Sequence, residues 1–189
     1  MYCDICGRKN ECPANAECKT KPRLNAGSGL MLKKEYINFD TKACEHHGMK
    51  TDILGDLNDL EKIFKPDTFE NIVAFHVVEH FEDALAVELL RKFFLLVRKG
   101  GTVAVETPDV IGLYKTYYEN PETRDEETLM THLYGNRQHW DDVGFHMSGW
   151  TQQRMAKAME SVGFKITHTG VGLSHGFGAR DLKVVGVKP

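Results

Sequence analysis

The sequence predicts an α/β protein built on a largely parallel sheet, and three consecutive segments carry this prediction. Residues 71–77, NIVAFHV, are nearly all apolar, as in a strand that is buried on both faces of a parallel sheet. The next segment is a predicted helix that Gly100 can end, and its apolar residues recur at helical spacing: Leu85, Leu89, Phe93 and Leu96. Residues 102–108, TVAVETP, then form a strand that Pro108 stops. Strand, helix and strand at this spacing make a βαβ crossover.

Shorter elements precede this unit, and a less regular region follows it. Residues 23–27 and 36–40 predict two short strands, and residues 51–54 predict a weaker third. A helical turn is expected over residues 58–64. After the βαβ unit, residues 111–147 are aromatic, charged and interrupted, which is more typical of a lid or a substrate wall than of a core.

The last part of the chain is regular again. Residues 151–164 predict a helix that Gly163 ends, and one face of it is apolar: Met155, Met159 and Val162. Residues 165–172 and 181–187 alternate between apolar and polar side chains, as in a closing hairpin.

Composition and charge exclude several classes of protein. A chain of 189 residues with 41% hydrophobic and 27% charged residues is typical of one soluble globular domain. A formal charge of −3 argues against nucleic-acid binding driven by bulk electrostatics. No apolar stretch has the length of a membrane span, so no membrane partner is expected. The N-terminus lacks the apolar core of a signal peptide, so we expect a cytoplasmic protein.

The cysteines are unevenly distributed. Four of the five crowd into the N-terminal segment: Cys3, Cys6, Cys12 and Cys18. The first two have the C-x-x-C spacing of a zinc knuckle, and four thiolates can complete a tetrahedral shell. The second two are not a C-x-x-C pair, so free cysteines in a reducing compartment are the alternative interpretation. Cys44, His46 and His47 could also supply ligands.

Two glycines and an acidic residue flank the first two predicted strands. Gly27 and Gly29 follow the first strand, and Asp40 closes the second. In an ordinary nucleotide-binding fold a full helix joins two such strands, but the connection from Gly29 to Tyr36 is too short for one. By themselves, these residues fit either a reduced cofactor site or an ordinary turn.

A longer pattern favours the cofactor site. The block NIVAFHVVEHFEDALAVELLRKFFLLVRKGGTVAVETPD resembles the centre of class I S-adenosylmethionine-dependent methyltransferases, in a type 11-like subgroup. Its pattern reads strand, H-V-x-E-H-F, helix, K-G-G, strand and P-D. The preceding LNAGSG…YINFD…TDILGDL resembles that subgroup's cofactor half, whose first helix is often shortened, and FHMSGWTQQRMAKAMESVGFKI resembles its tail.

The resemblance implies a domain organisation. It covers about residues 23 to 187 and implies a Rossmann-like, mostly parallel sheet of seven strands with a C-terminal antiparallel hairpin. We therefore expect a Cys-rich segment over residues 1–22, a candidate zinc module, and a methyltransferase domain over residues 23–189. Within that domain, a lid-like insertion is expected at about residues 110–147.

The resemblance also implies a cofactor site at the carboxyl ends of the strands. The glycines Gly27 and Gly29 would let the backbone approach the methionine portion of the cofactor, and Asp40 would accept both ribose hydroxyls. Asn25 stands where many class I enzymes have an acidic residue. Its amide can still bind the cofactor's ammonium group, but without the attraction of a charge.

Further along the chain, Asp56 is placed to accept from the adenine amino group, with Leu57 against the ring. His76 would line the sulfonium pocket. Glu79 and His80 allow three interpretations: a helix cap with a packed histidine, catalytic groups, or ligands of a divalent cation. The last is known near an E-x-x-E-H motif in some family members, but here His76 occupies its first position.

Methyl transfer from a sulfonium is an in-line displacement, so alignment and desolvation contribute most of the acceleration. A hydroxyl acceptor also needs a base, for which histidine is the usual residue. His146, between the insertion and the tail helix, is the first candidate, and His76 and His80 come next.

We therefore expect an S-adenosylmethionine-dependent methyltransferase that acts on a small-molecule or sugar-like acceptor. The alternative is a non-catalytic methyltransferase-like binding or scaffold protein with a zinc-stapled N-terminus. A nicotinamide dehydrogenase is disfavoured because the chain has no G-x-G-x-x-G motif. The sequence specifies neither the methylated atom nor the oligomeric state.

Overall fold

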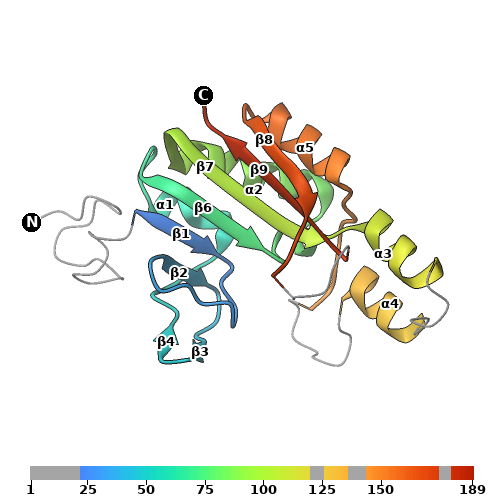
Figure 1. Ribbon diagram of the computed structural model, residues 1–189. Helices are drawn as coiled ribbons and strands as arrows, with labels where there is room; N and C mark the ends of the chain where they lie inside the picture. Colours follow the sequence, from blue (N-terminus) through green and yellow to red (C-terminus); the bar gives the residue numbers. More distant parts are fainter. Residues whose placement is uncertain (1–21, 120–125, 136–143, 175–179) are drawn as a thin grey trace, which may run out of the picture.

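The computed structural model describes residues 22–119, 126–135, 144–174 and 180–189. A seven-stranded sheet forms its centre (Figure 1). In order across the sheet, its strands are β5 (Ile53–Leu54), β2 (Ile37–Asp40), β1 (Arg23–Ala26), β6 (Phe69–Phe75), β7 (Val97–Pro108), β9 (Asp181–Val187) and β8 (Lys165–Val171). The first five strands are parallel to one another. Strand β9 is antiparallel to both β7 and β8. This confirms the predicted mostly parallel sheet with a closing hairpin.

Five helices and two short 3₁₀ turns accompany the sheet within the described ranges. The helices are α1 (Leu60–Ile63), α2 (Asp83–Leu96), α3 (Val110–Tyr118), α4 (Glu126–Tyr134) and α5 (Gln152–Ser161), and the turns are η2 (Leu57–Asp59) and η3 (Val78–His80). A small hairpin of β3 (Glu45–His46) and β4 (Met49–Lys50), which was not predicted, lies apart from the main sheet. None of the described helices is long and apolar enough to cross a membrane.

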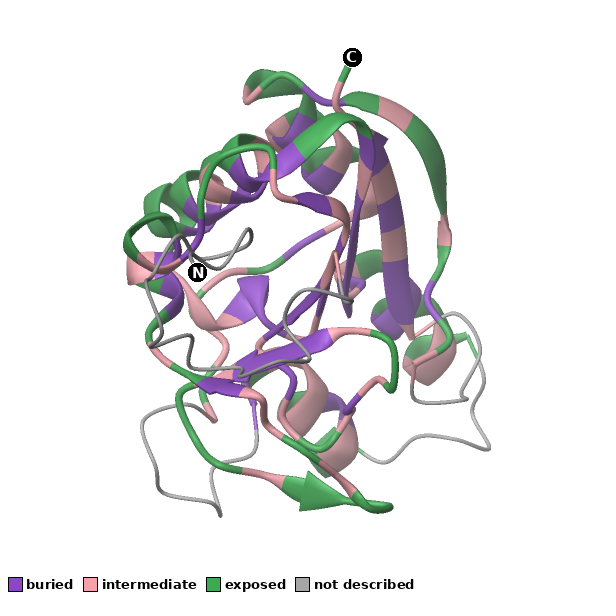
Figure 2. Ribbon diagram, turned by 90° about the vertical axis from the view of Figure 1, so that its left-hand side faces the viewer, coloured by how far each residue is buried: buried purple, intermediate pink, exposed green. Residues whose placement is uncertain are grey.

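The hydrophobic core lies between one face of the sheet and helices α1, α2 and α5 (Figures 1 and 2). Helix α2 contributes five buried side chains to it: Ala86, Leu89, Leu90, Phe93 and Leu96. Helix α5 adds the predicted Met155 and Met159. Each large apolar side chain buried here stabilises the fold by about 1.5–3 kcal/mol, so this face holds the sheet and its helices together.

Two details of the predicted βαβ unit are wrong. Leu85 is 49% exposed, because the buried stripe of α2 runs through Ala86 and Leu90 instead. The helix also ends before Gly100, since Val97 is already extended and begins β7. Val97 is fully buried and pairs with Phe69 of β6, so its β-branched side chain favours the sheet over another turn of helix. Gly100, with a φ of 75°, lies inside β7.

The other face of the sheet has no helix over it within the described residues. Side chains alternate along β6, so Ile72 and Ala74 enter the core while Asn71, Val73 and Phe75 point the opposite way. The predicted burial of this strand on both faces is therefore incomplete, since Asn71 and Phe75 are only half-buried. The reason is the short connection between β1 and β2, which contains no helix, as the sequence predicted.

Candidate active site

A pocket of about 540 Å³ opens at the carboxyl ends of β1, β2 and β6, where the sequence placed the cofactor. This volume suits a small-molecule cofactor. The lining includes six of the predicted residues: Gly27, Gly29, Asp40, Asp56, Leu57 and His76. His80 also lines it. Among the predicted cofactor residues, Asn25 does not belong to the lining.

The end of β2 and the glycine turn are tied together by the Asp40 carboxylate. The backbone N–H of Gly29 donates to Asp40 Oδ2 over 2.8 Å, and that of Lys42 donates to Oδ1 over 3.1 Å. The N–H of Ser28 also donates to the carbonyl of Phe39 over 3.0 Å. These bonds hold the carboxylate at the wall of the pocket, in a fixed position for accepting hydroxyl groups.

Gly27 permits close contact between the glycine turn and the segment after β6. Its φ is 66°, in the left-handed region, and a Cβ at this position would lie 2.5 Å from Val77 Cγ2. At Gly29, whose φ is 46°, a Cβ would meet nothing within 4 Å. The first glycine is therefore required by both conformation and space, and the second leaves open space beside the pocket.

The buried side chain of Asn25 holds the short connection between β1 and β2 in place. Its amide is 2% exposed and donates to the carbonyl of Met31 and to Asn38 Oδ1, each over 2.9 Å. Asn38, its partner in the β1–β2 register, in turn accepts from the N–H of Lys33 over 2.8 Å. Both N–H groups of Asn25 are thus used within the loop, and its predicted contact with the cofactor's ammonium remains a prediction.

Asp56 begins the η2 turn at the edge of the pocket. Its side chain caps the turn by accepting from the N–H of Asn58 over 2.8 Å, and Leu57 is 8% exposed in the same wall. An apolar side chain beside a fixed carboxylate fits the edge and face of an adenine ring. This arrangement agrees with the predicted adenine contacts, which stay a prediction.

His76 ends β6 in a left-handed conformation, with a φ of 55°. Its Nδ1 lies 3.1 Å from Glu79 Oε1, its Nε2 lies 3.6 Å from Asp181 Oδ2, and Ser174 Oγ lies 3.2 Å from Nε2. Burial alone would lower the pKa of His76, but the carboxylates of Asp181 and Glu79 outweigh it and raise this pKa to about 9. At neutral pH the ring is an imidazolium, so His76 cannot accept a proton from a substrate.

We expect the stability of the protein to fall as the pH rises through this range. The folded pKa of His76 is about 9 and its ordinary value is 6.5, so the stabilisation is complete below 6.5 and is lost as the pH approaches 9. The loss should be about 3 kcal/mol of unfolding free energy. Denaturant unfolding of the wild type and His76→Gln between these pH values checks this. An equal decline in the variant would show that other groups cause it.

Glu79, His80 and His146 form a compact cluster beside the pocket. One ligand atom from each lies within 4.8 Å of the other two, and the two imidazole centroids are 5.1 Å apart. His80 Nδ1 lies 2.9 Å from the carbonyl of Phe145, so Nδ1 donates a hydrogen bond to that oxygen. Burial and His80 lower the pKa of His146, outweighing the opposite effect of Glu79. His146 is therefore neutral and able to accept a proton at pH 7.

The buried Glu79 holds this cluster from two sides. Its carbonyl accepts the N–H groups of Met147 and Ser148 over 2.6 and 3.2 Å, which fixes the segment that carries His146. Its side chain is almost fully buried, yet neither carboxylate oxygen has a hydrogen-bond partner in the described chain. The 3.1 Å contact between Glu79 Oε1 and His76 Nδ1 is an ion pair. Although burial opposes ionisation, His76 and His80 hold the pKa of Glu79 below its usual value.

The predicted capping role of Glu79 is wrong. Glu79 lies within η3, and helix α2 begins after Glu82, which makes no side-chain cap. The suggestion that His80 packs under the insertion agrees with its contacts to Phe145 and His146.

Several residues of the pocket were not singled out from the sequence. They are Thr41, Lys42, Asn58, Val77 and Phe81, whereas Cys44, named above as a possible metal ligand, also lines the pocket. Val77 and Phe81 belong to the HVVEHF hexapeptide, so that motif could have indicated them. The others follow predicted site residues in loops whose course the sequence does not specify. Cys3, Cys6, Cys12 and Cys18 lie outside the described residues, and zinc binding by them stays a prediction.

Comparison with known proteins agrees with this geometry. A family model described as a methyltransferase domain matches residues 14–169. An S-adenosylmethionine-dependent methyltransferase of Archaeoglobus fulgidus superposes with a TM-score of 0.58 at 16% identity, covering 88% of this chain and 85% of its own. One from Mesorhizobium loti gives 0.56 at 16% identity, covering 87% and 90%. No curated protein matches the chain.

A third solved structure is the methyltransferase-fold partner in a Haloferax volcanii complex with the Trm112 methyltransferase activator. It has a TM-score of 0.54 at 13% identity and covers 88% of this chain and 81% of its own.

The fold is that of class I S-adenosylmethionine-dependent methyltransferases, as the sequence predicted. The chain belongs to the methyltransferase-domain family, whose model covers most of its length.

Proposed function

We propose that this enzyme binds S-adenosylmethionine in the 540 Å³ pocket and transfers its methyl group to a hydroxyl of a small-molecule or sugar-like acceptor. The Asp40 carboxylate carries the cofactor part of this proposal, because the glycine turn fixes it at the pocket wall. The neutral His146 supports the acceptor part, because it can take the proton that a hydroxyl releases. The intact pocket favours an enzyme over a non-catalytic scaffold protein. The expected compartment is still the cytoplasm.

Asp40→Ala should weaken the binding of S-adenosylhomocysteine by about 10- to 150-fold. Hydrogen bonds from ribose hydroxyls to a charged acceptor contribute about 1.5–3 kcal/mol. Isothermal titration of the folded variant measures this change, and Asp67→Ala, an exposed aspartate outside the pocket, is the control. If Asp40→Ala binds as tightly as the wild type, the pocket does not hold the ribose in this way.

The buried Glu79 carboxylate favours a second role for the same cluster. Glu79, His80 and His146 offer one carboxylate oxygen and two imidazole nitrogens within 4.8 Å, a donor set that divalent transition metals accept. The bond from His80 Nδ1 to Phe145 would orient its ring as a ligand. When bound, such a cation would polarise the acceptor oxygen. The residues would then hold the ion, and His146 would no longer be free to act as a base.

A further inference from the structure

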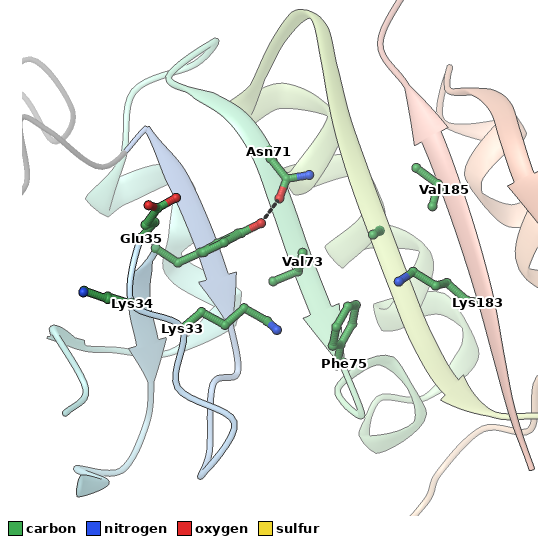
Figure 3. Close-up of a pocket in the computed structure, with 10 residues that line it drawn as sticks. Lys33, Lys34, Glu35, Asn71, Val73, Phe75, Lys183 and Val185 are labelled. Carbon is green, nitrogen blue, oxygen red and sulfur yellow. Dashed lines mark hydrogen bonds between the residues drawn. The ribbon is translucent and has the colours of Figure 1, made fainter. Parts of the chain in front are cut away.

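A second hollow lies on the face of the sheet that carries no described helix. It is a groove of about 690 Å³, within the range of small-molecule sites. Its apolar floor comes from neighbouring strands: Val73 and Phe75 of β6, Ala104 of β7 and Val185 of β9. Figure 3 shows Lys33 and Lys183 reaching across this floor from opposite sides of the Phe75 ring.

The two ammonium groups share one aromatic ring. Lys33 Nζ lies 4.9 Å and Lys183 Nζ lies 5.3 Å from the centroid of Phe75. Neither amine forms a salt bridge with a carboxylate in the described part of the chain. Burial and the neighbouring charge of Lys183 lower the pKa of Lys33, against the opposite effect of Glu106. Two like charges thus flank one aromatic ring in a partly buried groove, where an anion would relieve their repulsion.

The position of Lys33 is fixed by the fold. Its backbone N–H donates to Asn38 Oδ1 over 2.8 Å, and Asn38 Nδ2 donates to its carbonyl over 3.1 Å. Asn38 is itself buried and bonded to Asn25. On the other side, Lys183 lies within β9. Both lysines therefore extend from backbone that is held in place, which is required of a specific binding site.

The nearby carboxylates do not neutralise this pair of lysines. Glu106 lies on the same face of β7 and is almost fully buried, and its Oε1 accepts the backbone N–H of Ser174. With Lys33 and Lys183, it leaves a net charge of +1. Lys34 is exposed at the rim, and Glu35 pairs with Arg23. The groove therefore complements an anion.

The groove adjoins the cofactor pocket at the end of β6. Phe75 forms the floor of the groove and the next residue, His76, forms a wall of the pocket. Lys183 follows two residues after Asp181, whose carboxylate lies 3.6 Å from His76 Nε2. An acidic group held by both lysines therefore lies at the end of the groove next to the cofactor pocket.

We propose that this groove binds the acidic group of the methyl acceptor, so that the acceptor is a small molecule bearing a carboxylate or a phosphate on an apolar body. This inference rests on the proposed function. The acidic group lies beside the Phe75 ring between Lys33 and Lys183, and the rest of the acceptor extends past the end of β6 toward the cofactor pocket.

Three probe molecules test this with the full chain saturated with S-adenosylhomocysteine. Benzoate and phenyl phosphate carry the two candidate acidic groups, and benzamide is a neutral match. At constant ionic strength, titration followed by NMR should show that one or both anions bind at millimolar concentration and more tightly than benzamide. Lys33→Gln and Lys183→Gln should each weaken anion binding about tenfold, because each removes a bond to a charged group. Lys157→Gln, on the exposed side of α5, should leave it unchanged.

The affinity for S-adenosylhomocysteine should be the same in all three lysine variants. If the cofactor product binds but no anion does, or if benzamide binds equally well, the inference fails and the proposed function stands. An equal loss in Lys157→Gln would reveal non-specific charge attraction and also overturn it. If anions bind but S-adenosylhomocysteine does not, the proposed function fails and the acceptor assignment fails with it. A change in oligomeric state in Lys183→Gln, without a change in anion affinity, would instead identify the groove as an interface between copies.

Discussion

Replacing His146 with Gln should lower the turnover of a hydroxyl acceptor by about 100- to 10,000-fold, the usual contribution of a general base. Glutamine keeps much of the size and polarity of histidine but accepts no proton near neutral pH. Because the lowered pKa of His146 keeps its ring neutral, the wild type has the active base form at pH 7. Affinity for S-adenosylhomocysteine should not change, since His146 is not part of the pocket lining.

Single-turnover transfer of a labelled methyl group measures this effect, and His168→Gln, an exposed histidine on β8, is the matched control. The same assay with a chelator added distinguishes a role of His146 as the base from a role as a ligand of a cation. If His146 is the base, chelator leaves the wild-type rate unchanged. If the cluster holds a divalent ion, chelator removes the activity, added metal restores it, and Glu79→Gln abolishes the restoration. Full turnover in His146→Gln without metal dependence would contradict both roles and leave an acceptor that needs no base.

Gly27→Ala should destabilise the protein by about 2–5 kcal/mol and weaken cofactor binding as well. An L-residue in the left-handed region costs about 1–2 kcal/mol, and overpacking costs about 1–3 kcal/mol. Both apply here, because φ is 66° and the new Cβ would lie 2.5 Å from Val77 Cγ2. Val77 is itself 4% exposed and has little room to move away.

The variant Gly29→Ala distinguishes the cost of the left-handed conformation from the cost of the contact with Val77. Its φ of 46° carries the conformational cost, but its Cβ would meet no atom within 4 Å. We therefore expect about half the loss of unfolding free energy in Gly29→Ala, measured by denaturant titration of both variants. Equal losses would mean that the contact with Val77 relaxes easily and that the turn conformation alone matters.

The fold was predictable from the sequence where its signals are local. The strands and helices around α2 follow from apolar spacing, which depends only on neighbouring residues. The error at Gly100 has a tertiary cause, since pairing of Val97 with Phe69 decides where the helix stops. The β3–β4 hairpin is too short and too exposed to leave a periodic signal.

Site residues that lie in one sequence motif were predictable. Contacts between residues that only the strand order brings together were less so. HVVEHF led to His76, Glu79 and His80, but not to the imidazolium state of His76, because Asp181 reaches it only through the strand order. Asn25 and Asn38 do carry a signal, since RLNAG and YINFD each have Asn at the same place and become register partners. The approach of Lys33 and Lys183 to Phe75 has no sequence signal.

The strand order also has a consequence for how the chain acquires its fold during synthesis. Strands β1 and β2 leave the ribosome early, but β1 must pair with β6, as Leu24 does with Ile72. Until β6 emerges, β1, β2 and β5 form at most a sheet of three short strands. The β6–α2–β7 stretch pairs two long strands and covers them with the apolar face of α2, so it is the first stretch that can enclose a core. The cofactor half is therefore made first and docks later, onto a nucleus encoded by the middle of the gene.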